Sequence, residues 1–247
     1  MRIAMWSGPR NISTAMMRAW ENRPDTAVVD EPFYAYFLSR SGLDHPGRDE
    51  VIASQPTDWR EVVEGLLGPV PGGRPVFYQK QMTHHVLPGM GLEWLQDVTN
   101  CFLIRHPREV VASYVETRSA PTAQDLGFAR QADLFRRVAD QRGEAPPVVD
   151  AADVLRDPGG TLAALCKAVG VPFYEAMLSW PPGRRASDGV WAPYWYASVE
   201  KSTGFRAYRP SAKAVPPELE SLVDHGLAYY EVLSGYRIQS TEGAGGE

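Results

Sequence analysis

Residues 2–20 read RIAMWSGPRNISTAMMRAW, and this stretch decides the fold class. Residues 2–6 are mostly apolar and predict a buried strand, which the turn formers at 7–9 then break. Residues 12–22 predict a helix with two hydroxyl side chains in its first turn. A strand, a tight turn and a helix N-terminus bring free N–H groups and the positive end of the helix dipole to one point. The stretch therefore indicates an anion-binding βα unit.

Strands and helices continue to alternate along the chain. Short apolar runs predict strands at 26–30, 75–80, 99–104 and 147–150. Amphipathic stretches predict helices at 33–40, 58–67, 107–118, 124–142, 158–170, 173–179 and 216–234. Alternation of this kind builds βαβ units, so we predict an α/β fold: a three-layer sandwich around a central, mostly parallel sheet.

The length of the chain fits one domain with a short extension. The chain has 247 residues, and we expect residues 1–239 to form a single domain. Residues 181–213 are rich in Pro, Gly, Trp, Tyr and Arg and lack periodicity, which predicts a lid or substrate loop. Residues 240–247 are rich in Gly and Glu and predict a disordered tail.

The composition limits the class of protein and its partners. A hydrophobic fraction of 44% and a charged fraction of 22% exclude wholesale disorder and a collagen. With a net charge of −5, and no run near the ~20 apolar residues that span a bilayer, we expect neither nucleic acid nor membrane as a partner. Cys101 and Cys166 lie in apolar stretches and predict buried free thiols. Because no signal peptide is visible, we expect a cytoplasmic location.

The turn after the first strand has the chemistry of a phosphate site. Arg10 offers a bidentate, charged donor, and the hydroxyls of Ser13 and Thr14 add two more donors. The G-x-x-x-x-G-K-[ST] pattern of ATP and GTP hydrolases is absent, and with it the lysine that contacts the phosphates. For this segment alone, an ordinary βα turn with a Ser or Thr cap is an alternative.

A second cation follows the strand at 99–104. Arg105 lies where that strand ends, at the edge where open α/β sheets bind ligands. Ser113 comes eight residues later in the next predicted helix, from which it can face back toward Arg105. The two side chains can converge on one phosphate. The alternative is a surface arginine and an unrelated helix serine.

Together the two segments resemble the sulfotransferase superfamily, including its bacterial members, whose sulfuryl donor is 3′-phosphoadenosine 5′-phosphosulfate. In that family P-[KR]-[ST]-G-[ST]-T after the first strand holds the 5′-phosphosulfate, and an Arg followed eight residues later by a Ser holds the 3′-phosphate. Arg105 and Ser113 match the second motif, and the first is matched by Pro9, Arg10, Asn11, Ile12, Ser13 and Thr14.

The resemblance covers about residues 1–120 by motif and the remainder by architecture alone. It implies a P-loop nucleotide hydrolase-like fold, the donor named above, adenosine 3′,5′-bisphosphate as its product, and no metal. Ile12 stands where the family has Gly. Because a β-branched residue rarely adopts a positive φ, we expect the loop to bend differently there.

Glu31 is one candidate for the base that activates an acceptor. It follows the strand at 26–30, beside Asp30, and lies 21 residues after Arg10. The resemblance to tyrosylprotein-type and several bacterial sulfotransferases implies that a Glu at such a place deprotonates the acceptor hydroxyl. The alternative is a Glu that caps the next helix.

Lys80, His84 and His85 offer a second candidate set. They loosely resemble the K-T-H-L-P motif of cytosolic sulfotransferases, which implies a His base and a Lys that assists the transfer. Here the histidines come four and five residues after Lys80 instead of two. The roles of base, substrate contact and loop residue therefore stay open for them.

An aromatic stretch, residues 191–205, follows late in the chain. Its Trp and Tyr rings can stack on an adenine or an acceptor, or can pack this segment onto the domain. The superfamily closes over its cofactor with a late basic loop, and by position Lys201 and Gly204 correspond to it. His45 and His225 have no such context, and we expect them on the surface.

The leading hypothesis is a sulfotransferase that moves a sulfuryl group from the nucleotide donor to an acceptor hydroxyl or amine. A P-loop small-molecule kinase is one alternative, which would need Mg²⁺ ligands and a lysine in the loop. A non-catalytic nucleotide-binding module on the same fold is the other, and Ile12 favours it. Adjacent histidines without nearby Cys or a matching carboxylate pair do not predict a metal site.

Overall fold

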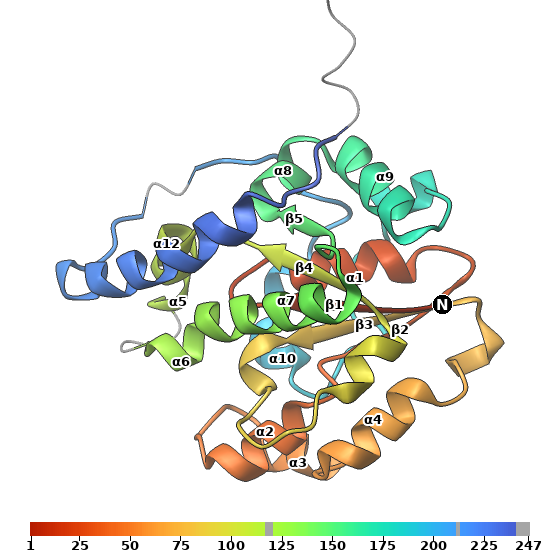
Figure 1. Cartoon of the computed structure of the whole chain (residues 1–247), viewed down its shortest axis with the longest axis horizontal. Coiled ribbons are helices and arrows are strands. Elements are labelled where there is room, and N and C mark those ends of the chain that lie inside the picture. The colour runs from red at the N-terminus through yellow and green to blue at the C-terminus, as the bar shows by residue number, and fades with distance from the viewer. Residues whose placement is uncertain (117–120, 211–212, 241–247) are drawn as a thin grey trace, which may run out of the picture.

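Five strands form a parallel sheet in the computed structural model, which describes residues 1–116, 121–210 and 213–240 (Figure 1). The strand order is β2-β3-β1-β4-β5, and all four pairings between neighbours are parallel. The prediction of an α/β fold with a mostly parallel sheet is confirmed. The strands are β1 (Arg2–Ser7), β2 (Thr26–Asp30), β3 (Val76–Met82), β4 (Thr99–Ile104) and β5 (Val148–Asp150).

Helices cover both faces of the sheet, because alternate side chains of each strand are apolar in both directions. Trp6 and Phe102 pack toward α4, α7 and α12, whereas Met5 and Leu103 pack toward α1 and α9. A parallel sheet that is buried on both faces has this near-continuous apolar sequence. The helices are α1 (Ser13–Glu21), α2 (Tyr34–Ser41), α3 (Arg48–Ser54), α4 (Trp59–Leu67), α5 (Pro107–Tyr114), α6 (Ala123–Leu126), α7 (Phe128–Arg142), α8 (Ala151–Arg156), α9 (Pro158–Val169), α10 (Ala192–Trp195), α11 (Ala197–Glu200) and α12 (Glu220–Ser234).

Several helices differ from the sequence-based expectation. The predicted helix at 173–179 is a 3₁₀ turn, η4 (Glu175–Leu178), and α3 and α8 were not predicted. The prediction at 107–118 was too long, since α5 ends at Tyr114, and its last two positions lie outside the described residues. The remaining 3₁₀ turns are η1 (Pro71–Gly73), η2 (Thr83–His85), η3 (Glu93–Asp97) and η5 (Pro217–Leu219).

The predicted helix at 124–142 is broken at Gly127. This residue has φ +69°, so it ends α6 and begins α7. The corner also leaves no room for a side chain, because a Cβ on Gly127 would lie 2.8 Å from Thr83 Oγ1. The preceding carbonyl, that of Leu126, would lie 2.9 Å from a Cβ on Gly8. The α6–α7 corner therefore packs closely against both β-strand ends that carry these neighbours.

The segment 181–213 is fixed to the domain by buried polar contacts, and two of its residues, 211 and 212, lie outside the described part. It contains the short helices α10 and α11. Arg18 on α1 binds Asp188 through two nitrogens, at 2.6 and 2.7 Å from its carboxylate oxygens, and both side chains are buried. Trp191 and Tyr196 pack against α2. The expected lid is thus partly a core element.

Two expectations about the whole chain can be compared with the structure. Cys101 and Cys166 are buried free thiols, as predicted. In the described residues, no helix is both long enough and apolar enough to cross a membrane. The expected tail at 240–247 lies outside the described residues except for Ser240.

Candidate functional site

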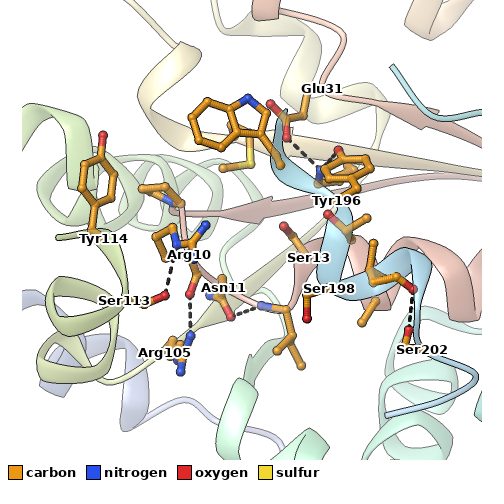
Figure 2. Close-up of a pocket in the computed structure, with 18 of the residues that line it drawn as sticks. Arg10, Asn11, Ser13, Glu31, Arg105, Ser113, Tyr114, Tyr196, Ser198 and Ser202 are labelled. Atoms are coloured by element: carbon orange, nitrogen blue, oxygen red, sulfur yellow. Dashed lines mark hydrogen bonds and ion pairs between the residues drawn. The ribbon is translucent and has the colours of Figure 1, made fainter. Parts of the chain in front are cut away.

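A cavity of about 390 Å³ opens at the carboxyl ends of the strands. The crevice between β1 and β4 is the point where the strand order reverses, which is where α/β sheets bind ligands. Figure 2 shows Arg10, Ser113 and Arg105 together on one side of the cavity, and Glu31 with Tyr196 on the other. The structure brings thirteen predicted site residues to this wall: Pro9, Arg10, Asn11, Ile12, Ser13, Thr14, Glu31, Lys80, His84, His85, Arg105, Ser113 and Gly204.

The loop after β1 turns at Arg10 and not at Ile12. Arg10 has φ +55°, whereas Ile12 has φ −88°, an ordinary value for a β-branched residue. Asn11 secures the turn, since its amide donates to the Leu103 carbonyl at 3.1 Å and its oxygen accepts the Ile12 N–H at 2.9 Å. The positive φ therefore falls at Arg10, two positions before Ile12, and a bend that differs from the family pattern stays a prediction. Ile12 itself packs toward the core.

The N-terminus of α1 has no side-chain cap. Ile12 is its N-cap residue and has no side-chain acceptor, so Ser13 and Thr14 are the first helical residues and not caps. The alternative of an ordinary turn capped by Ser or Thr is therefore not what forms here. Uncapped N–H groups and the helix dipole, with two hydroxyls beside them, form a cradle for an anion.

Two guanidinium groups complete this end of the cavity. Arg10 Nε donates to Ser113 Oγ at 3.1 Å, and Arg105 Nη1 donates to the Arg10 carbonyl at 2.6 Å. Glu109 holds Arg105 from behind, at 3.0 Å. Burial lowers the pKa of Arg10, the nearby Glu116 opposes this, and the charge of Arg105 adds to the lowering. A bound anion would relieve the repulsion between the two cations, so the donor set fits phosphate or sulfate groups.

Lys80 is the centre of the opposite end. Its ammonium lies 2.9 Å from Asp30 Oδ1, 2.8 Å from Glu31 Oε1 and 2.5 Å from the Tyr196 hydroxyl. Burial alone would lower the pKa of Lys80, but the facing Asp30 and Glu31 carboxylates and Tyr196 raise it well above its ordinary value. The ammonium therefore stays protonated and the group is a buried ion cluster.

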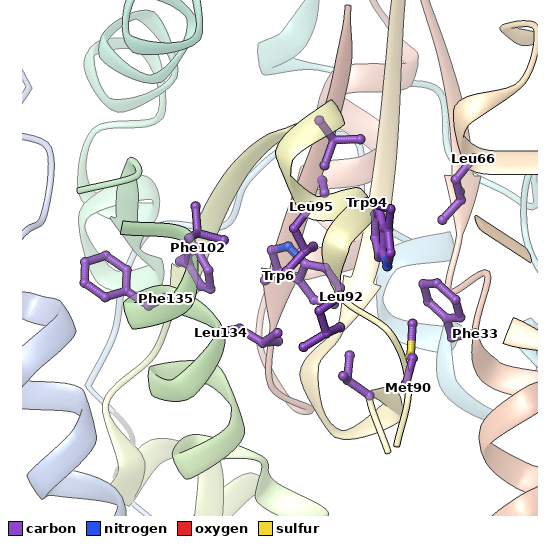
Figure 3. Packing of buried hydrophobic residues seen from close by; sticks show 14 of the residues in the cluster. Trp6, Phe33, Leu66, Met90, Leu92, Trp94, Leu95, Phe102, Leu134 and Phe135 are labelled. Carbon is purple, nitrogen blue, oxygen red and sulfur yellow. The ribbon is translucent and has the colours of Figure 1, made fainter. Parts of the chain in front are cut away.

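Glu31 lies on a strained turn that its neighbours hold in place. It has φ +40°, and its N–H donates to the Lys80 carbonyl at 3.0 Å. Phe33, two residues on, packs 5.8 Å from Trp94 in the core beneath the sheet edge (Figure 3). Strain of this kind persists where the surroundings over-determine it. The alternative that Glu31 caps the next helix is not what forms, because α2 has no side-chain cap.

Electrostatics makes Glu31 a stronger base than an exposed carboxylate. Burial raises its pKa, the charge of Lys80 lowers it, and Asp30 raises it again, so that the net pKa lies above the ordinary value. One carboxylate oxygen, Oε1, accepts from Lys80, while Oε2 lies 4.0 Å from His85 Nε2. Oε2 is thus the carboxylate oxygen that does not contact Lys80.

The two adjacent histidines are neutral parts of the cavity wall. Burial lowers the pKa of His84 to about 3. Burial, with smaller contributions from His84, His45 and Lys80, lowers the pKa of His85 well below its usual range. His85 is 1% exposed and stacks between Tyr34 and Phe37, each at 4.8 Å. Within the described part of the chain, the Nδ1 atoms of both histidines are buried and have no hydrogen-bond partner.

Comparison with known proteins identifies the family. Residues 1–235 match the family model described as "Sulfotransferase domain". The chain belongs to the sulfotransferase family. This family and the fold support a sulfotransfer function.

Longer plant proteins are also similar to this sulfotransferase-family chain. "Branched-chain-amino-acid aminotransferase-like protein 1" of Arabidopsis thaliana is 35% identical over 234 residues, which is 95% of this chain and 42% of that protein. Its relative, "Branched-chain-amino-acid aminotransferase-like protein 2", is 32% identical over 231 residues, 94% of this chain and 41% of that protein. The chain therefore spans about two fifths of their length.

A solved sulfotransferase structure shares the fold. The crystal structure of a sulfotransferase from Alicyclobacillus acidocaldarius matches with a TM-score of 0.54 and 13% sequence identity, over 96% of each chain. At this identity the similarity shows the fold alone.

Some positions in this sulfotransferase cavity differ from the sequence-based expectation. Lys201 is exposed and is absent from the wall, whereas Arg206 and Gly204 line it. His45 was expected on the surface, but it is half-buried, lines the cavity and lies 2.7 Å from the Tyr34 hydroxyl. In residues 1–116, 121–210 and 213–240, no group of three or more His, Cys, Asp or Glu could hold a metal.

Tyr196 is the main site residue that sequence reasoning missed. The aromatic stretch at 191–205 was singled out for stacking, but nothing in it marked one hydroxyl as the partner of Lys80 and Asp30. Trp191 is buried and donates to Tyr196, while Trp195 lines the cavity. Packing thus accounts for Trp191, whereas contact between Trp195 and a ligand stays a prediction.

Proposed function

We propose that this chain transfers a sulfuryl group from 3′-phosphoadenosine 5′-phosphosulfate to a hydroxyl or amine acceptor. The observation that carries the proposal is one cavity with a cationic cradle at one end and a carboxylate base at the other. A nucleotide with phosphates on the 3′ and 5′ positions of its ribose needs the cationic cradle. Deprotonation of an acceptor needs the carboxylate base.

Residues of two motifs would hold the donor. Arg10, Ser13, Thr14 and the N–H groups of α1 would bind the 5′-phosphosulfate. Arg105 and Ser113 would bind the 3′-phosphate. The remaining loop residues, Pro9, Asn11 and Ile12, shape the cradle. In the late loop Gly204 lines the cavity and packs against the Leu178 carbonyl, from which a Cβ would lie only 2.9 Å away. Lys201 is the nearby exposed cation.

The other end would prepare the acceptor. Glu31 Oε2 would take the acceptor proton, with Oε1 fixed by Lys80. The ring faces of Tyr34 and Trp195 and the neutral imidazoles of His84 and His85 would hold the rest of the acceptor. When bound, the donor would supply the sulfuryl group. A new S–O bond to a hydroxyl, or an S–N bond to an amine, would form as the S–O bond to the 5′-phosphate breaks and its electron pair leaves with that phosphate. Arg10 and the helix N-terminus would stabilise the charge that develops there.

The two alternatives have less support. A kinase of the P-loop type would need a lysine in the loop and Mg²⁺ ligands, and the described loop holds an arginine and hydroxyls. A non-catalytic module was favoured by Ile12, but Ile12 keeps an ordinary backbone and leaves the cradle open.

Nucleotide binding tests the proposal directly. Thermal shift and calorimetry would compare adenosine 3′,5′-bisphosphate, 5′-AMP and ATP with Mg²⁺. We expect the bisphosphate to bind best. Equal affinity for the bisphosphate and 5′-AMP would contradict the donor assignment. If the bisphosphate binds selectively, assays with labelled donor and a panel of alcohols, phenols and amines would identify the acceptor.

A further inference from the structure

The Tyr196 hydroxyl lies at the centre of the buried ion cluster. It is 2.7 Å from Asp30 Oδ2 and 2.5 Å from Lys80 Nζ, and it accepts the indole N–H of Trp191 at 3.1 Å. Gly189 N–H donates to the same Asp30 oxygen at 3.2 Å. Three residues of the 181–213 segment therefore reach the cluster, and Tyr196 joins both charged partners.

Counting hydrogen-bond capacity shows that the cluster is complete. An ammonium has three N–H donors, and those of Lys80 face Asp30, Glu31 and Tyr196. A tyrosine hydroxyl has one donor, which points to Asp30, and two lone pairs, which accept from Lys80 and Trp191. Lys80 thus has no N–H left for a transferred group, although the resemblance to cytosolic sulfotransferases implies that it assists the transfer.

The same cluster leaves one carboxylate oxygen for chemistry. Both Asp30 oxygens accept hydrogen bonds, and so does Glu31 Oε1. Among the described residues Glu31 Oε2 has no donor within hydrogen-bond distance, His85 being the neighbour at 4.0 Å. The cluster is therefore built so that a single acceptor oxygen faces the cavity.

We infer that Asp30 and Tyr196 are positioning residues, which hold Lys80 on Glu31 and keep Lys80 from the reacting atoms. This inference rests on the proposed function, in which Glu31 is the base. Lys80 pairs with both Asp30 and Glu31, so its positive charge neutralises Glu31 only in part and Glu31 keeps its basicity. Tyr196 hydrogen-bonds to both Lys80 and Asp30 and so fixes their positions.

The electrostatic environment of Glu31 gives the direction of the effect. The titratable groups that face it from every packed element are Asp30, Lys80, Tyr196, Tyr34, His84, His85 and His45. Burial keeps His84 and His85 neutral, and the charges that act most strongly on Glu31 are Lys80 and Asp30. Removing the Asp30 charge would leave Lys80 to act on Glu31 alone, which lowers the pKa of Glu31.

A titration of Glu31 tests this without any substrate. In protein carrying ¹³C at the glutamate carboxyls, the Glu31 signal is the one lost in Glu31→Gln. We expect Asp30→Asn to move its midpoint to lower pH by about 1 on the pH scale. The matched control is Asp49→Asn, whose side chain is 92% exposed and does not line the cavity. An unchanged midpoint in folded Asp30→Asn would overturn the inference.

The second test measures the kinetics of variants made both in the wild type and in Glu31→Gln. The assay is hydrolysis of the donor to adenosine 3′,5′-bisphosphate. Tyr196→Phe keeps the ring, and we expect it to lower kcat about tenfold with donor KM unchanged, while Tyr194→Phe in the same segment has no effect. In the Glu31→Gln background, Tyr196→Phe and Asp30→Asn should cause no further loss, because they act through Glu31.

The outcomes separate the two proposals. A further tenfold loss in the Glu31→Gln background would show that the cluster contacts the reacting atoms itself, and would overturn the inference. If Asp30→Asn fails to fold, Tyr196→Phe decides by the same comparison. If the wild type neither binds the bisphosphate nor hydrolyses the donor, the proposed function fails, while the titration still decides whether Asp30 controls Glu31.

Discussion

The two ends of the cavity are built in different ways. The donor end, where we propose that the nucleotide binds, consists of the loop after β1, the N-terminus of α1 and two arginines, of which Arg105 remains 23% exposed. The acceptor end, where we propose that the acceptor is deprotonated, consists of charged side chains from separate elements, and Lys80 and Asp30 are 1% and 2% exposed. An anion cradle can thus be made by local backbone geometry, whereas a tuned base needs long-range contacts that exclude water.

Glu31→Gln should break the acceptor end and leave the donor end intact. Gln keeps the size of the side chain and removes the proton acceptor, so we expect kcat to fall by about 10²- to 10⁴-fold. Affinity for adenosine 3′,5′-bisphosphate should barely change, measured by calorimetry. Glu64→Gln, on the exposed surface of α4, is the matched control.

Variants of the two histidines test whether a histidine, and not Glu31, is the base. We expect His85→Asn to raise the acceptor KM more than it lowers kcat, because its neutral imidazole is part of the wall. If Glu31→Gln turns over normally and a His84 or His85 variant is inactive, the base is a histidine.

Arg105→Ala should break the donor end alone. Loss of a desolvated arginine–phosphate pair costs about 2–5 kcal/mol of binding free energy. The preference for the bisphosphate over 5′-AMP should therefore collapse, measured as the ratio of two Kd values. Arg108→Ala is the control, since Arg108 lies three residues on, pairs with Glu220 and does not line the cavity. A retained preference would place the 3′-phosphate elsewhere.

The pH dependence of kcat/KM sharpens the comparison. The pKa of Glu31 is raised, so protonation removes the base as pH falls through a value above the ordinary 4.5, and the rate should drop about tenfold per pH unit below it. His84, with a pKa of about 3, does not titrate in that range. The fall of kcat/KM at low pH should be absent in Glu31→Gln. The affinity for the bisphosphate should not fall over the same pH range. If it did, protonation of Glu31 would also affect binding at the donor end.

Chelation is the smallest expected effect. We expect EDTA to change bisphosphate binding and donor turnover by less than about twofold, because the cradle supplies its own cations. The same assay with added Mg²⁺ is the comparison. A strict need for Mg²⁺ would favour the kinase alternative.

The sequence predicted the donor end better than the acceptor end for a physical reason. The apolar strands and the Arg105–Ser113 spacing are local patterns, and the structure brings these residues to one wall. Partnership of Tyr196 with Lys80 spans 116 residues and depends on how the 181–213 segment folds back, which no local pattern records. The positive φ of Arg10 and Glu31 was equally invisible, because neither residue type marks it.

The α6–α7 corner gives the two ends a common mechanical support. The Leu126 carbonyl packs closely against Gly8 in the loop after β1. Gly127 packs closely against Thr83, the first residue of the 3₁₀ turn η2 that carries both histidines. A bulkier corner would push both walls at once. If the proposed function holds, a change at this corner should alter donor affinity and acceptor choice together, so an effort to re-engineer the acceptor from this corner would have to follow nucleotide affinity as well.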